Sequence, residues 1–591
     1  MQRNKDIIFI APLLTVVSFL LLFIFRSWDD NRLTSWHWVF GKAEPVKVFF
    51  ALSAGCGFVS LLAGLARGWR YSGRPLPYSS GVRASLRFPA AACAGITRLF
   101  AIVTVYFLCG MIFWTMPEVN IDASRYFTQA KHLELFGVRY FLNEWGREIH
   151  AWTDMPLVPF FYGVIFRYFG ESRFYIQFFT TSLFSLTGVL TYKTGQELWD
   201  EETGIYGAAF LLCIPYLYTQ IPLMLVDVPA MFLLLLSIFA FIRALKRGGL
   251  WIAVASLAIS FAFLSKYSAW LMLSVLPVIA GVLALQSKEP ATSTCLMRAA
   301  VTFSVALLIL GSFVLFEYDV IRRQVMLLMA YQKPALKGWE ESFFSTFLFQ
   351  THPLLTASAF VSVYVAFKKK DGKYLIILWL VLLVVLLQIR RIRYIVMVFP
   401  LLALMASYGL RSVKRLETRI ITVSCALVSS LVIAVTAYLP FVQGLSMVNL
   451  KKAGEFLDTR SSSYIEVHVI QPDDPAGSLL VAVPIMDLFT RKTLIVDDHI
   501  AVRQHAEAAG SSPLRFTWEF KNPSYYSSAG ISTNIDTVAV ISESAGRQIP
   551  SYLDVRLAGF RLVKSFDDYE DIFRFRTGVR IYEKKGDERD L

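Results

Sequence analysis

The chain has 591 residues, of which 55% are hydrophobic and only 17% are charged, and its mean hydropathy is +0.52. Soluble domains are about one-quarter charged, and the apolar residues of this chain lie in long blocks. This combination indicates an integral membrane protein and excludes an ordinary soluble one. The formal net charge of +14 does not indicate nucleic-acid binding, because basic residues gather at the ends of membrane spans, where they set the topology.

The first apolar segment, Ile7–Phe25, follows the short polar start MQRNKD. A cleavable signal peptide is one interpretation, but the segment is long for one and no small-residue cleavage site follows it. We therefore expect a retained span with a cytoplasmic N-terminus.

About thirteen segments approach the roughly 17–25 residues that cross a bilayer. Their alternation places the stretches RALKRGG, KKKDGK and RSVKRLETR on one side, which the positive-inside rule makes cytoplasmic. Met155–Gly170 is short and contains prolines, so we expect an interfacial or re-entrant helix there. The predicted spans are Ile7–Phe25, Val46–Ala63, Ala94–Thr115, Phe178–Tyr192, Ile205–Ile221, Leu223–Ile242, Trp251–Leu264, Trp270–Leu285, Ala299–Phe316, Thr346–Phe367, Leu375–Ile389, Ile395–Leu410 and Ile420–Leu439.

Composition divides the chain into three parts. An N-terminal transmembrane hairpin with a basic cytoplasmic loop precedes a transmembrane core with two outer loops. The short β-like runs SLLVAVPIM, KTLIVDD, TVAVISES and FRFRTGVRIYEKK then predict a C-terminal α/β domain on the outer face. The expected bounds are 1–93, 94–445 (with outer loops at 116–177 and 317–345) and 446–591.

Two acids at the outer face are candidates for chemistry. Asp122 and Arg125 are spaced i, i+3, so they share a face of a helix that begins near Ile121. They form either a local ion pair or helix cap, or a base beside a phosphate clamp. Asp227 begins an otherwise apolar span, where an ionisable group is a functional candidate. The alternative is an acid favoured by the helix dipole, with Pro229 in the first turn.

A third group, Glu148, His150 and Asp154, lies in the same outer loop. His150 and Asp154 are four residues apart, and carboxylate and imidazole groups bind divalent metals. The loop lacks an HExxH pattern or another specific metal-binding spacing. We therefore keep two interpretations, a substrate-binding group and a divalent-metal site.

Several cations are expected on the side that the positive-inside rule disfavours. An anionic ligand at the outer membrane interface would explain them, whereas the alternative is solvated residues or pairs with local acids. These cations are Arg125, Lys266, Arg322, Arg323, Lys333, Arg390, Arg391 and Arg393, and Lys337 lies in the same second loop.

The order of these motifs resembles the GT-C membrane glycosyltransferases. An outer Asp-x-x-Arg-Tyr (Asp122 to Tyr126) is followed by Trp-Thr-Asp-x-Pro (Trp152 to Pro156), LVDVP, FLSKYSA and Arg-x-Arg-Tyr. The resemblance covers roughly Ala94–Leu439 and is closest to the protein O-mannosyltransferases and the lipid A aminoarabinose transferase. It implies a GT-C-like core that moves a hexose or pentose from a polyprenyl-phosphate carrier to a lipid, glycan or protein acceptor on the outer side.

The resemblance also implies roles for individual residues. Asp122 would be the catalytic carboxylate, Asp227 the second family acid and Arg125 a ligand of the donor phosphate. Arg393 and Tyr394 would approach the carrier's head group. The family often has Asp-Lys-Pro where this chain has Asp154-Met155-Pro156, and Lys266, Arg322 and Arg323 are the candidates to replace that lysine.

The residue types suit this chemistry. A carboxylate can take the proton of the attacking acceptor, and arginine or lysine can stabilise a lipid-phosphate leaving group. The competing interpretations are a transporter or lipid flippase, which should show repeat symmetry and broken helices at the bilayer midplane, and a receptor-like scaffold. The expected location is a prokaryotic plasma membrane, with the C-terminal domain extracytoplasmic.

Overall fold

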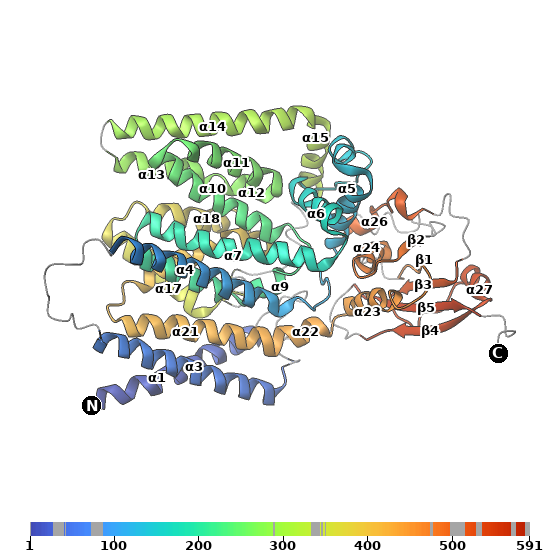
Figure 1. Ribbon diagram of the computed structural model, residues 1–591, viewed down its shortest axis with the longest axis horizontal. Coiled ribbons are helices and arrows are strands. Elements are labelled where there is room, and N and C mark those ends of the chain that lie inside the picture. Colours follow the sequence, from blue (N-terminus) through green and yellow to red (C-terminus); the bar gives the residue numbers. More distant parts are fainter. Residues whose placement is uncertain are drawn as a thin grey trace.

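The structure is a computed structural model of the chain. It describes residues 2–27, 41, 43–72, 87–287, 290–332, 343, 347–348, 350–472, 477–496, 514–527, 535–568 and 575–585. Helices form a long bundle, and a smaller sheet domain, orange to red in Figure 1, lies against one end of it.

The bundle is that of a polytopic membrane protein, as predicted. Among the described residues, eight helices are long and apolar enough to cross a membrane, and four shorter apolar helices accompany them. The count of thirteen spans stays a prediction. The eight candidate spans are Pro45–Leu65, Gly95–Phe113, Arg173–Leu198, Asp227–Arg247, Tyr267–Gln286, Ala291–Phe316, Ile392–Leu410 and Leu416–Gln443.

Helical elements make up most of the described residues from Gln2 to Gln443. They are α1 (Gln2–Ser27), α3 (Pro45–Ser72), α4 (Arg87–Gly110), η1 (Met111–Phe113), α5 (Ala123–Glu144), α6 (Leu157–Phe169), α7 (Arg173–Leu198), α8 (Glu201–Leu212), α9 (Pro215–Gln220), α10 (Asp227–Arg247), α11 (Leu250–Ser265), α12 (Tyr267–Met272), α13 (Val275–Gln286), α14 (Ala291–Phe316), α15 (Tyr318–Leu327), η2 (Leu328–Gln332), α17 (Pro353–Lys369), α18 (Tyr374–Leu386), α19 (Ile392–Ile395), η5 (Val396–Val398), α20 (Phe399–Leu410), α21 (Leu416–Ile433), η6 (Ala434–Tyr438) and α22 (Leu439–Gln443).

The N-terminal hairpin, α1 and α3, packs on α21 at the edge of the bundle (Figure 1). This contact is close, because a Cβ added to Gly55 would lie 2.4 Å from Cγ1 of Val428. The hairpin is therefore an addition to the side of the core rather than a part of its centre.

The basic stretches lie at the end of the bundle away from the sheet domain (Figure 1). The carboxylate of Glu197 lies 2.7 Å from Nε of Arg243 and 3.2 Å from Nζ of Lys246. Arg419 forms an ion pair with Glu202. These pairs join α10 and α21 to the α7–α8 turn. The predicted cytoplasmic stretches thus share one face.

The helices α5 and α6 lie at the other end of the bundle, between the spans and the sheet domain (Figure 1). α6 has 13 residues and packs along α5. A span needs about 17–25 residues, so α6 is too short to cross a bilayer, as expected for this segment.

The C-terminal domain contains a five-stranded sheet in the order β2-β1-β3-β5-β4. β2, β1 and β3 are parallel, whereas β5 is antiparallel to β3 and β4. Helices flank the sheet and bury its apolar side chains. The elements are α23 (Met447–Leu457), β1 (Tyr464–Val469), η7 (Leu479–Val481), α24 (Ala482–Asp487), β2 (Thr493–Val496), α26 (Arg515–Trp518), η9 (Ser524–Tyr526), β3 (Thr537–Ser542), α27 (Ser551–Leu557), β4 (Phe560–Phe566) and β5 (Gly578–Lys584).

The prediction of a strand is wrong for one of the four β-like runs. SLLVAVPIM forms the helices η7 and α24. Every residue of this run is buried, and α24 packs between α23 and α5. A short, fully buried apolar run has no period that separates a strand from a helix. The strands β1 and β4 were not among the predicted runs.

Two glycines allow α7 and α8 to approach each other closely. A Cβ on Gly204 would lie 2.2 Å from the carbonyl oxygen of Tyr192, and a Cβ on Gly195 would lie 2.7 Å from Cα of Gly204. Real Cβ atoms do not approach backbone this closely, so a larger residue would push the helices apart.

Gly204→Ala is therefore expected to destabilise the protein by about 1–3 kcal/mol through overpacking. Gly311→Ala is the control, since a Cβ on Gly311 meets nothing within 4 Å. That change should be neutral or stabilising, because alanine favours helix more than glycine does. Thermal unfolding in detergent measures the stability of both variants. Equal melting temperatures for Gly204→Ala and Gly311→Ala would contradict the close packing of α7 and α8.

Candidate active site

Six of the predicted residues meet at the end of the bundle that faces the C-terminal domain. Three carboxylates alternate with three cations, so that each inner group contacts two groups of opposite charge. The order is Asp154, Arg125, Asp122, Arg393, Asp227 and Lys266. We call this set the charged network.

The first half of the charged network comes from the start of α5. Asp122 occupies the N-cap position of α5, and its backbone N–H donates to Oδ1 of Asn120 at 3.0 Å. One turn later, Nη2 of Arg125 lies 3.4 Å from Asp122 and 3.2 Å from Asp154. The predicted i, i+3 pair is thus formed, and it extends to a second acid.

Asp154 reaches Arg125 through a loop. The backbone of Trp152 has φ of 46°, a region that non-glycine residues seldom adopt, and it directs the chain into a turn that brings Asp154 inward. Gln129 donates to Oδ2 of Asp154 at 3.1 Å, and Gln324 of α15 donates to its backbone carbonyl at 3.2 Å. Gln129 of α5 thus holds the carboxylate of Asp154, and Gln324 of α15 holds its backbone.

The second half of the charged network comes from the membrane spans. Asp227 is the first residue of α10, and its Oδ1 lies 2.6 Å from Nζ of Lys266, which stands at the break between α11 and α12. Arg393 of α19 bridges the halves, with 2.5 Å to Asp122 and 3.1 Å to Asp227. Nζ of Lys266 lies 5.2 Å from the ring of Tyr394.

The two acids of the outer loop differ in their electrostatic surroundings. Burial alone would raise the pKa of Asp122, but Arg125 and Arg393 outweigh it and hold that pKa well below its usual range. Burial raises the pKa of Asp154, and Arg125 opposes it only in part. The side chain of Asp122 is 18% exposed, whereas those of Asp154 and Asp227 are 4% and 1% exposed. Asp122 is therefore the most exposed of the three acids, and its two arginines favour its ionised form.

A buried ion pair that the sequence analysis missed positions both halves. Nε of Arg173 lies 2.9 Å from Glu118, and the Glu118 carboxylate also accepts from the backbone N–H of Met224 at 3.2 Å. Glu118 lies four residues before Asp122, and Met224 three before Asp227. The only signal in the sequence was an acid beside Pro117 at the end of a span.

The expected group of Glu148, His150 and Asp154 does not form. Glu148 and His150 are exposed, whereas Asp154 is buried beside Arg125. An i, i+4 spacing brings side chains together on a helix, but residues 145–156 form a loop. Across the described residues, no group of three or more His, Cys, Asp or Glu side chains is arranged to hold a metal ion.

The arginines of the second outer loop also stay outside the charged network. Arg322 and Arg323 are exposed on α15, and Arg323 donates to the carbonyl of Gly146 at 3.2 Å. Of the candidates to replace the family lysine, only Lys266 therefore joins the acids. Lys333 and Lys337 lie outside the described residues.

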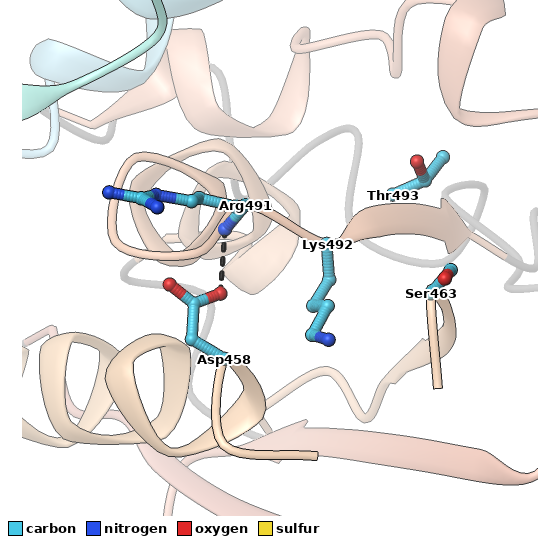
Figure 2. Close-up of a pocket in the computed structure, with 5 residues that line it drawn as sticks. All are labelled: Asp458, Ser463, Arg491, Lys492 and Thr493. Atoms are coloured by element: carbon cyan, nitrogen blue, oxygen red, sulfur yellow. Dashed lines mark hydrogen bonds between the residues drawn. The ribbon is translucent and has the colours of Figure 1, made fainter. Parts of the chain in front are cut away.

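A separate pocket lies on the C-terminal domain, where Figure 2 shows its lining side chains. It sits at the amino ends of β1 and β2, whereas ligands of open α/β sheets bind beyond the carboxyl ends of the strands. Its acid is already used, since Asp458 accepts from the backbone N–H of Arg491 at 2.7 Å. None of the predicted site residues lines it. The lining residues are Asp458, Ser463, Arg491, Lys492 and Thr493.

The charged network predicts a specific coupling between Asp227 and Lys266. Asp227→Asn leaves Lys266 without its carboxylate, and breaking a buried ion pair in this way costs about 3–5 kcal/mol. Adding Lys266→Met removes the unpaired charge, so the double variant should regain part of that loss. Unfolding in detergent of the wild type, the two single variants and the double variant measures the coupling between the two residues. Strictly additive losses of stability would contradict direct pairing.

Comparisons with known proteins find similarity in part of the sequence and in the fold. Residues 151–331 match the family described as dolichyl-phosphate-mannose-protein mannosyltransferase. This range contains Asp154, Asp227 and Lys266. No curated protein sequence matches the chain.

Solved structures resemble a larger part of the chain. ArnT from Cupriavidus metallidurans in the apo state is 12% identical, with a TM-score of 0.51 over 83% of this chain and 98% of that one. The same protein bound to undecaprenyl phosphate has a TM-score of 0.47 at the same identity and coverage. The Archaeoglobus fulgidus oligosaccharyltransferase AglB, with an inhibitory peptide and a dolichol-phosphate, is 10% identical with a TM-score of 0.44, over 75% of this chain and 69% of that one.

The resemblance predicted from the motifs is thus confirmed. Over 83% of its length the chain has a fold similar to that of ArnT, and residues 151–331 match the mannosyltransferase family. The chain is a polytopic membrane protein with a GT-C-like fold.

Proposed function

We propose that the protein transfers a sugar from a polyprenyl-phosphate-linked donor to an acceptor on the outer face of the membrane. The observation that carries this proposal is the charged network, in which a partly exposed carboxylate, Asp122, stands between Arg125 of the outer-loop helix α5 and Arg393 at the start of an apolar span. A lipid-linked donor needs this combination, because its phosphate must be bound where its chain can still lie in the membrane.

Arg393, Arg125 and Lys266 are proposed to bind the donor phosphate. All three are paired with carboxylates, so the network is neutral as it stands and an entering phosphate must compete for them. Tyr394, next to Arg393 and near Lys266, would line the approach to the head group. The name of the matched family supports a phosphate-linked sugar as the donor.

Asp122 is proposed as the base in a single displacement. The acceptor hydroxyl attacks the anomeric carbon, the bond from that carbon to the phosphate oxygen breaks, and the hydroxyl proton passes to Asp122. Asp122 thereby loses one negative charge and the leaving phosphate gains one. Arginines that face both groups can follow this movement of charge without a change in their own protonation.

Donor binding would also activate the base. With both arginines paired to it, Asp122 has a low pKa and accepts a proton poorly. A phosphate that takes over Arg393 or Arg125 removes this stabilisation, and the pKa of Asp122 rises. The base would then become effective only when a donor is present.

The orientation follows from the charges at the two ends of the bundle. The stretches RALKRGG, KKKDGK and RSVKRLETR carry an excess of lysine and arginine at the end opposite the C-terminal domain, which supports a cytoplasmic location for that end. The charged network and the C-terminal domain would then be extracytoplasmic. A prokaryotic plasma membrane is our proposed location.

No observation on the described residues favours the transporter, flippase or scaffold interpretations. The ionisable groups of the charged network gather at one end of the bundle, whereas transporter sites lie near the bilayer midplane. The matched family is one of transferases.

Asp122→Asn should lower kcat by about 10²–10⁴-fold, because it removes the proton acceptor. Transfer of labelled sugar from a polyprenyl-phosphate donor in reconstituted membranes measures this loss. Glu148→Gln, an exposed acid of the same loop, is the control and should transfer sugar normally. Normal turnover of the Asp122 variant would show that another group is the base.

The displacement mechanism predicts the stereochemistry of the product. One displacement at the anomeric carbon inverts its configuration, whereas a covalent intermediate on a carboxylate would retain it. A donor of known anomeric configuration should therefore give a product of the opposite configuration by NMR. Retention would refute a single displacement while leaving the class of enzyme intact.

A further inference from the structure

The C-terminal domain shares one apolar core with the outer loop that carries Asp122 and Asp154. Ile121 and Trp152 are buried in the same cluster as Leu450, Val467 and Phe516 of the C-terminal domain. Ile121 precedes Asp122 directly, and Trp152 lies two residues before Asp154. The positions of both acids therefore depend on side chains of a domain that contributes no charge to the network.

One aromatic side chain of this domain reaches an arginine of the charged network. The ring of Phe516 lies 4.7 Å from the guanidinium carbon of Arg125, closer than the 5.7 Å of the neighbouring Tyr126 ring. Phe516 is only 6% exposed. A ring stacked on a guanidinium covers its face but leaves its in-plane N–H groups available, and those of Arg125 point to Asp122 and Asp154.

The helix that carries Phe516 is fixed to the body of its own domain. Oγ1 of Thr517 accepts from the backbone N–H of Ser478 at 2.9 Å and donates to the carbonyl of Leu514 at 2.7 Å. On the other side, Arg515 lies 5.6 Å from the ring of Tyr331. These contacts hold α26 against the sheet domain on one side and against η2 on the other.

We propose that Phe516 is a positioning residue that orients Arg125 for the donor phosphate, so that the C-terminal domain completes the active site. This inference rests on the proposed function. A guanidinium in a buried site is useful only if its plane is fixed, and cation–π stacking supplies that constraint from one face. Without the ring, Arg125 can rotate about its side-chain bonds and lose its alignment with Asp122 and Asp154.

The first experiment compares kinetics of the full-length protein. Phe516→Ala should raise the KM for the polyprenyl-phosphate donor about tenfold with a smaller change in kcat, because a phosphate contact acts on bound donor and transition state alike. Phe516→Tyr keeps the ring and should restore the wild-type KM. Phe520→Ala is the matched control, since Phe520 is also 6% exposed in the same apolar cluster.

The second experiment does not depend on activity. Labelling of Arg125 by phenylglyoxal, followed by mass spectrometry, should be several-fold faster in Phe516→Ala than in wild type or Phe520→Ala. Equal labelling and equal KM in all variants, or equal increases in Phe516→Ala and Phe520→Ala, would overturn the inference. If labelling rises only in Phe516→Ala but the wild type transfers no sugar, the placement of Arg125 by Phe516 is supported and the proposed function fails separately.

Discussion

Arg393 connects the two halves of the site, and the arrangement of the outer end depends on this one bridge. Its guanidinium binds Asp122 of the outer loop and Asp227 at the head of a membrane span. A buried charge costs several kcal/mol unless it is paired, and Arg393 gives each acid a second cation besides Arg125 or Lys266. The same requirement forces α5, α10 and α19, which are distant in sequence, to meet at one point.

A network of this kind is suited to a reaction that moves negative charge without creating any. Its six groups balance, and the incoming phosphate can replace a carboxylate as the partner of a cation. In the proposed mechanism Asp122 would take up a proton while the leaving phosphate becomes more negative, and the same arginines would stabilise both states. The buried pair of Glu118 and Arg173 holds the scaffold on which this exchange occurs.

The sequence predicted the polar residues well because charges inside apolar segments have few alternative roles. Asp227 is such a charge, whereas Asp122 and Arg125 follow from their i, i+3 spacing, and Lys266 and Arg393 follow from positive charge on the outer side and from the family resemblance. The prediction of a group formed by His150 and Asp154 failed because these residues lie in a loop. An i, i+4 spacing brings side chains together only on a helix. The sequence also could not show that Phe516, distant in sequence and apolar, packs on Arg125, because such a contact follows from the docking of one domain on another.

The most direct test of this account is a structure of the full chain in lipid nanodiscs with polyprenyl phosphate, determined by electron cryo-microscopy. We expect the phosphate within hydrogen-bonding distance of Arg393, with the contact between Arg393 and Asp122 lengthened and the Asp122 carboxylate facing an open acceptor side. A phosphate bound elsewhere, with the bridge from Arg393 to Asp122 and Asp227 unchanged, would contradict the exchange of partners on which the mechanism depends.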